Sequence, residues 1–160
     1  MITLTPARMR DCAEIHRMQQ AAFQELLHQY HDIATNPGAE TVAQVIERME
    51  QPNTDYYFIA LGERHIGAIR IVSLSAQKCR IAPIFILPEY QGMGYAQQTL
   101  SQAERMYPNA VTWELDTIQQ EQKLCHLYEK MGYVPTGKKE QIQDNMSIIF
   151  YRKTVEPQAF

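Results

Sequence analysis

The segment Ile84–Gln97, IFILPEYQGMGYAQ, constrains the fold more than any other part of the chain. An apolar, strand-like run ends at Pro88, a loop containing Gly92 and Gly94 follows, and a helical pattern begins directly after it. The first N–H groups of a helix lack intrahelical acceptors and the helix dipole makes that end partly positive, so it binds phosphate. Glycine lets a ligand approach the backbone without a Cβ in the way. We therefore predict a diphosphate site on the backbone amides of Gly92, Met93, Gly94, Tyr95, Ala96 and Gln97.

Hydrophobic periodicity places this segment within a longer series of strands and helices. Strands are expected at residues 2–4, 55–61, 65–74, 79–87, 111–117, 133–139 and 146–153. Helices are expected from an Asp11–Glu14 capping box onward, along the stripe Val42, Val45, Ile46 and Met49, and at residues 94–107 and 121–131. This order predicts an α/β protein of the α+β type, with about four helices on a mixed, mostly antiparallel central sheet of about seven strands.

Length, charge and cysteine content narrow the class of protein. The 160 residues predict a single domain, 1–160. A net charge of −3 argues against a nucleic-acid partner, because phosphate contacts need a basic surface. The sequence has no signal-like start and no apolar run of about 18 residues, so we expect no membrane association and a cytoplasmic location. Cys12, Cys79 and Cys125 form no CxxC pair, which indicates neither disulfides nor a metal site.

A dinucleotide-binding fold is an alternative interpretation of the glycine loop. Gly92-x-Gly94 follows a strand and opens a helix, and Asp116 lies further along, as an acidic ribose ligand would. However, Gln97 replaces the third glycine, and only one parallel strand–helix–strand unit can be drawn around the motif. A dinucleotide-binding domain needs several such units, so the pattern disfavours this alternative.

Two signatures together resemble the GNAT N-acetyltransferase family. Gln91, Gly94 and Ala96 match its Gln/Arg-x-x-Gly-x-Gly/Ala loop, which binds the coenzyme A pyrophosphate. Tyr128, followed by Gly132-Tyr133, matches its Tyr-x-x-x-Gly-Phe/Tyr signature. The resemblance implies the GNAT fold, acetyl-CoA as co-substrate, and transfer of the acetyl group to a primary amine of a small molecule or peptide by direct attack on the thioester. A non-catalytic acyl-CoA-binding sensor or interaction module on the same fold is the alternative.

The resemblance also implies roles for individual residues. The main-chain groups of Ile84, Phe85 and Ile86 would pair with the pantetheine arm as with an added strand. Tyr128 would protonate the departing thiolate, although its place on an apolar helical stripe also fits simple core packing. Asp116 and Glu114 lie two apart on a predicted strand and share a face, so both are candidate bases, with a water relay as the third possibility.

Three positions depart from the family pattern. Gly92 and Met93 stand where the family often carries Arg or Lys, so no residue is assigned to the coenzyme 3'-phosphate. Glu121 stands where the family commonly has an Asn that bonds the pantetheine arm, and an ionised Glu has no hydrogen to donate.

The acceptor site of the family is built from the first two helices and the late strands. The corresponding region here contains Glu25, His28, Tyr30, His31 and Asp32. We interpret the histidines as solvent-facing rather than as a metal pair, and favour solvated surface charges for the two acidic residues over attraction of a cationic amine. The acceptor is not identified. The hydrophobic closing strand, whose residues 146–151 read MSIIFY, is a candidate for pairing across a homodimer.

Overall fold

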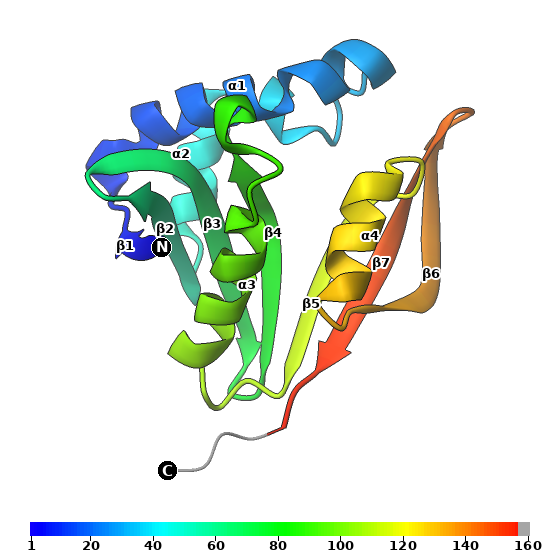
Figure 1. Cartoon of the computed structure of the whole chain (residues 1–160). Helices are drawn as coiled ribbons and strands as arrows, with labels where there is room; N and C mark the ends of the chain where they lie inside the picture. Colours follow the sequence, from blue (N-terminus) through cyan, green and yellow to red (C-terminus); the bar gives the residue numbers. More distant parts are fainter. Residues whose placement is uncertain (157–160) are drawn as a thin grey trace.

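A computed structural model describes residues 1–156 as seven strands and four α-helices around one sheet (Figure 1). The strands are β1 (Thr3–Pro6), β2 (Thr54–Leu61), β3 (Arg64–Ser75), β4 (Lys78–Ile86), β5 (Thr112–Ile118), β6 (Val134–Gln143) and β7 (Met146–Thr154). The helices are α1 (Cys12–Tyr30), α2 (Val42–Glu50), α3 (Tyr95–Met106) and α4 (Gln122–Lys130). Both the strand–helix order and the predicted mixed sheet are confirmed.

The sheet order is β1-β2-β3-β4-β5-β7-β6, and only the β4–β5 pair is parallel. The last strand therefore lies inside the sheet, with β5 on one side and β6 on the other. The expectation that residues 146–151 pair across a dimer is wrong for this reason, because both edges of β7 already bond to neighbouring strands. The free edges of the sheet belong to β1 and β6.

Helices cover the two faces of the sheet unequally. The face that we call the α1–α2 face packs Ile15 and Val45 against Phe58 and Phe85. The opposite, α3–α4 face buries Leu100 and Tyr128 with Trp113 and the many isoleucines of β3 and β4. In Figure 1, α3 lies in front of the β1–β4 half of the sheet and α4 in front of the β5–β7–β6 half.

β4 and β5 are paired only at their beginnings. Lys78, Cys79 and Arg80 pair with residues 112–114, and beyond this point the two strands separate (Figure 1). A β-bulge at Ala82-Pro83, where two residues of β4 oppose the single Arg70 of β3, falls where the strands part. Because a bulge bends its strand, it contributes to the divergence of β4 from β5. The last half of β4 consequently has an unpaired edge toward β5.

The apolar stripe predicted for α2 is confirmed, but the capping box predicted for α1 is not. Thr41 and Gln44 form a reciprocal capping box before α2, whose Val45 is fully buried. Asp11 instead turns back and accepts a hydrogen bond from the Arg8 N–H at 2.8 Å, which stabilises a short 3-10 turn, Met9–Asp11. Glu14 pairs with His65 of β3 at 2.5 Å. The prediction of an Asp11–Glu14 capping box was therefore wrong, because each carboxylate has a competing partner.

Over residues 1–156, no helix is both long and apolar enough to cross a membrane.

Buried tyrosines should make the protein sensitive to alkali. Burial raises the pKa of seven tyrosines, and that of Tyr30 to about 12: Tyr30, Tyr56, Tyr57, Tyr107, Tyr128, Tyr133 and Tyr151. Unfolded tyrosines ionise near pH 10, so above that pH the folded state binds more protons than the unfolded state, and stability falls. We expect the Tm to be flat from about pH 7 to 9 and to drop steeply above about pH 10. A Tm that is unchanged well above pH 10 would contradict this.

Candidate functional site

The loop between β4 and α3 has the backbone shape that the sequence predicts. β4 runs into a 3-10 turn, Pro88–Tyr90, and Gly94 forms the N-cap of α3. Gly92 and Gly94 have φ of 76° and 82°, in the left-handed region. A Cβ built on either glycine would meet no atom within 4 Å, so the space above this loop is open. The two glycines therefore expose the loop backbone instead of accommodating a packed neighbour.

The amides of this loop are unpartnered. Within residues 1–156, no backbone or side-chain acceptor bonds to the N–H groups of Gly92, Met93 and Gly94. The next three, from Tyr95, Ala96 and Gln97, belong to the first turn of α3, which no side chain caps. Six consecutive amides, 92–97, thus lie at the positive end of a helix dipole without an acceptor in the described part of the chain.

Gln91 closes the turn that precedes these amides. Its Nε2 donates to the Ile86 carbonyl oxygen at 2.8 Å, which ties the loop to the end of β4. Met93 is 58% exposed and contributes its amide rather than a packed side chain. The side chain of Gln91 accordingly supports the shape of the loop.

The open edge of β4 presents Ile84 and Ile86. The Leu87 N–H bonds to Ile66 of β3 at 2.8 Å, and a Cβ on Gly67 of β3 would overlap the Phe85 carbonyl oxygen. Phe85 and Leu87 therefore face β3, and alternation along the strand turns the polar groups of Ile84 and Ile86 toward β5. Phe85 differs from the prediction here: its main chain faces β3, and its ring packs edge-on against Phe23 of α1 at 5.8 Å.

Tyr128 lies on α4, beside this edge. Its ring is 6% exposed and meets Tyr133 edge-on at a centroid distance of 6.1 Å, within the same core cluster as Ile86. Within the described chain its hydroxyl has no hydrogen-bond partner, yet it is not among the unpartnered atoms that are sealed from solvent, as that of Tyr133 is. Burial raises the pKa of Tyr128, and the charge of Asp116 raises it further. Tyr128 thus presents a protonated, uncommitted hydroxyl at neutral pH.

The two candidate bases share a face, as predicted, but both are ion-paired. Asp116 is bound by the guanidinium of Arg80. Glu114 lies 3.2 Å from Lys78 and 3.5 Å from Arg152. After burial, the charge of Asp116 contributes to the raised pKa of Tyr128. Of the two carboxylates, Asp116 is therefore the one whose charge is linked to Tyr128.

Residues of the expected acceptor region have structural partners that the sequence did not reveal. The Tyr30 hydroxyl donates to Glu121 at 2.5 Å, which joins the end of α1 to the start of α4. Asp32 is buried and accepts from the Ala34 and Thr35 amides at 3.2 and 3.1 Å, so its interpretation as a solvated charge was wrong. Within residues 1–156, no three potential metal ligands cluster.

Comparison with known protein families identifies the family of this chain. The profile described as "Acetyltransferase (GNAT) domain" matches residues 17–155. The chain belongs to the GNAT acetyltransferase family. It is accordingly an acetyl-CoA-dependent N-acetyltransferase, which confirms the resemblance drawn from the glycine loop and the Tyr128 signature. No curated protein sequence matches significantly.

Solved GNAT structures share the fold at low sequence identity. The ribosomal-protein-S18-alanine N-acetyltransferase of Escherichia coli has a TM-score of 0.78 at 11% identity, over 99% of this chain and 97% of that one. The spermidine N-acetyltransferase of Vibrio cholerae, solved with CoA and spermine, has 0.74 at 18% identity, over 96% and 95%. A putative streptothricin acetyltransferase of Bacillus anthracis, solved with acetyl coenzyme A, has 0.59 at 21% identity, over 69% and 67%. These TM-scores establish a shared fold.

The residues present in this GNAT domain fit acetyl-CoA. The amides of residues 92–97 offer donors for a diphosphate, and the unpaired edge of β4 offers main-chain groups for an extended arm. The hydroxyl of Tyr128 lies in the same core cluster as Ile86 and has no competing partner within residues 1–156. The diphosphate, the pantetheine arm and the sulfur of acetyl-CoA therefore each have complementary groups in this protein.

Proposed function

We propose that this GNAT enzyme acetylates a primary amine by direct attack of the amine on acetyl-CoA, in the opening between β4 and β5. Acetyl-CoA supplies an acetyl group that its thioester activates. The observation that carries the proposal is the combination of the free β4 edge, the unpartnered amides 92–97 and the uncommitted hydroxyl of Tyr128.

Each of these groups has a distinct part. The amides of residues 92–97 bind the diphosphate, and Ile84 and Ile86 align the arm along β4. Tyr128 holds a proton for the departing sulfur, and its raised pKa keeps that proton in place at neutral pH. Gln91 acts indirectly, by holding the loop to Ile86.

Asp116 is the better supported of the two candidate bases. An attacking amine must be neutral, so a group near the thioester has to accept its proton. We expect Asp116→Asn to lower kcat/KM by about 10²-fold or more, in the range for loss of a general base. Steady-state kcat/KM of this variant with the best amine acceptor is the measurement that checks the assignment.

Arg80→Gln separates catalysis from ion pairing at this position. It removes the same ion pair but keeps the carboxylate, so kcat/KM should fall much less in that variant. A large loss of kcat/KM in Glu114→Gln but not in Asp116→Asn would transfer the role to Glu114. Retention of kcat/KM in both carboxylate variants would support a water relay.

A thiol-release screen tests the function as a whole. Structural neighbours are named for spermidine and for a ribosomal-protein alanine, so the panel should contain polyamines, amino acids, small amines and peptides. We expect release of coenzyme A that depends on both acetyl-CoA and at least one amine. Thermal stabilisation by acetyl-CoA without thiol release across the panel would instead support a non-catalytic sensor.

We further propose that the enzyme works in the cytoplasm. Its three cysteines are free thiols, which suits a reducing compartment. Fractionation of cells that express a tagged copy would test the location.

A further inference from the structure

The sheet carries a polar pocket on the face opposite α4. α1 and α2 cover the α1–α2 face over β2, β3 and β4, and the C-terminal end of α1 also packs on Ile118 of β5 and Met146 of β7. The part of β5–β7–β6 around Glu114, Phe150 and Arg152 is left open. A pocket of about 470 Å³ occupies this uncovered part and begins where β4 leaves β5. It is lined by Arg80, Glu114, Leu115, Thr136, Lys138, Phe150, Tyr151 and Arg152. The pocket is therefore next to the proposed reaction centre, on the side away from α4.

Positive charge is in excess at this pocket, although the whole chain carries −3. The cations on this part of the face are Lys78, Arg80, Lys138 and Arg152. The carboxylates are Glu114, Asp116 and Glu140, the last of which lies opposite Ile148 on the same face. Glu114 divides its charge between Lys78 and Arg152, and its contact to Arg152 is as long as 3.5 Å. One positive charge is consequently left over.

The ammonium of Lys138 has no ion-pair partner in the described part of the chain. Its ammonium lies 4.3 Å from the centroid of the Phe150 ring, and no carboxylate within residues 1–156 is within 4.0 Å of it. The ring face attracts the cation and holds it at the pocket wall without neutralising it. Arg152, whose side chain is 49% exposed, still has guanidinium N–H groups to offer.

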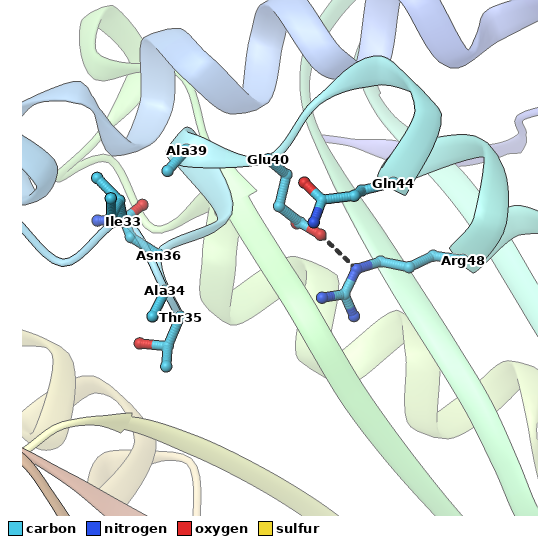
Figure 2. A pocket seen from close by; sticks show the side chains of 8 residues that line it. All are labelled: Ile33, Ala34, Thr35, Asn36, Ala39, Glu40, Gln44 and Arg48. Carbon is cyan, nitrogen blue, oxygen red and sulfur yellow. Dashed lines mark hydrogen bonds and ion pairs between the residues drawn. The ribbon is translucent and has the colours of Figure 1, made fainter.

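Further guanidinium groups lie on the α1–α2 face beyond the pocket. Arg70 is 5% exposed and donates to the Ala82 carbonyl oxygen at 2.8 Å. Burial lowers the pKa of Arg70, and the neighbouring charges of Arg48 and Arg80 lower it further. Figure 2 shows that Arg48 bonds Glu40 through Nε and directs its other two nitrogens away from that carboxylate. Guanidinium groups thus follow one another across this side of the sheet.

We propose that the acceptor is an amine that also carries an anionic group, a carboxylate or a phosphate, which binds Lys138 and Arg152 in this pocket. The proposal rests on the acetyltransferase function proposed above. An acceptor with only positive charges would meet like charge here, whereas a carboxylate or phosphate accepts hydrogen bonds from ammonium and guanidinium groups together. The anionic group would hold the molecule, and its amine would extend toward the point where β4 and β5 separate.

Matched acceptors test this proposal even while the natural substrate is unidentified. 4-Aminobutyrate, n-butylamine and putrescine differ only in a terminal carboxylate, methyl or ammonium-bearing group, and 3-aminopropyl phosphate supplies the phosphate case. α-Amino acids and short peptides should be compared with their C-terminal amides in the same way. We expect kcat/KM for anionic members to exceed that of their uncharged or cationic partners by about tenfold or more. Preference within the anionic members then separates carboxylate from phosphate. Equal or better turnover of polyamines and uncharged amines would overturn the proposal.

Lys138→Gln tests the assigned residue. For the best anionic acceptor, KM should rise about tenfold with kcat nearly unchanged, because the lost contact is made before and during transfer alike. Lys139→Gln is the matched control: it removes the same charge from the adjacent residue of β6, whose partner Ile149 lies in the α3–α4 core. An unchanged KM in Lys138→Gln, or an equal rise in Lys139→Gln, would refute the role of Lys138.

Measuring the binding of the anionic compounds separates failure of the pocket proposal from failure of the acetyltransferase proposal. If no amine releases thiol, the acetyltransferase proposal fails, and calorimetry with the coenzyme A-loaded protein still tests the pocket. Binding of the anionic compounds that Lys138→Gln abolishes and Lys139→Gln retains would support the site. Equal binding of an acid and its amide to the wild-type protein would exclude it.

Discussion

Tyr128→Phe is expected to lower kcat at least tenfold, and by as much as 10²- to 10⁴-fold if the hydroxyl is the main general acid. Phenylalanine keeps the ring that packs against Tyr133 at 6.1 Å and removes only the uncommitted hydroxyl. Acetyl-CoA affinity should therefore stay within about twofold, because the lost interaction develops only as the sulfur departs. Steady-state kinetics together with a coenzyme titration measure the two quantities separately.

Tyr133→Phe is a close control for this experiment. Its hydroxyl is buried without a partner in the described chain and is sealed from solvent, so its removal should leave kcat unchanged. The wild-type enzyme should show no loss of kcat from Tyr128 ionisation below about pH 10, because the pKa of Tyr128 is raised. Unchanged turnover in Tyr128→Phe would remove this residue from the mechanism.

Gly94→Val is expected to abolish coenzyme binding. Gly94 has φ of 82° at the N-cap of α3, a conformation that a β-branched residue strongly disfavours. Nothing lies within 4 Å of an added Cβ, so the new side chain would extend into the open space over the amides where the diphosphate should bind. Backbone strain and occlusion act together, and calorimetric titration with acetyl-CoA should show no measurable binding.

Gly62→Val separates occlusion from strain. Gly62, in the turn between β2 and β3, also has a positive φ, of 63°, and no atom within 4 Å of an added Cβ. The variant should lose stability to a similar degree yet bind coenzyme as the wild type does. Wild-type affinity in Gly94→Val would show that the β4–α3 loop is not the binding site.

Features that depend on neighbouring residues were predictable from the sequence. Helix α3 was expected at residues 94–107 and occurs at Tyr95–Met106, because Gly94 and Pro108 limit it locally. The apolar stripe of α2 is local in the same sense. The glycine loop was predictable because the conformation of its glycines requires no distant partner.

Features that depend on distant contacts were not predictable. Arg80 binds Asp116 across 36 positions of sequence, and Tyr30 binds Glu121 across 91. Neither pair lies at a spacing that a helix or strand pattern would reveal. Phe85 was predicted, together with Ile84 and Ile86, to pair with the pantetheine arm, because the sequence does not show which edge of β4 pairs with β3. The cationic pocket brings together side chains from four strands, β4, β5, β6 and β7, which only the sheet order makes adjacent.

The interior position of β7 determines when the sheet can be completed. β6 precedes β7 in the chain but pairs only with β7, so it has no partner until β7 has been synthesised and has docked on β5. Lys138, Phe150 and Arg152 are assembled by that same late event, because they lie on these two strands. A nascent chain that stops before Met146 would expose the edge of β5 and would present no completed acceptor side. We therefore expect the sheet and the pocket to be completed only after β7 has been synthesised.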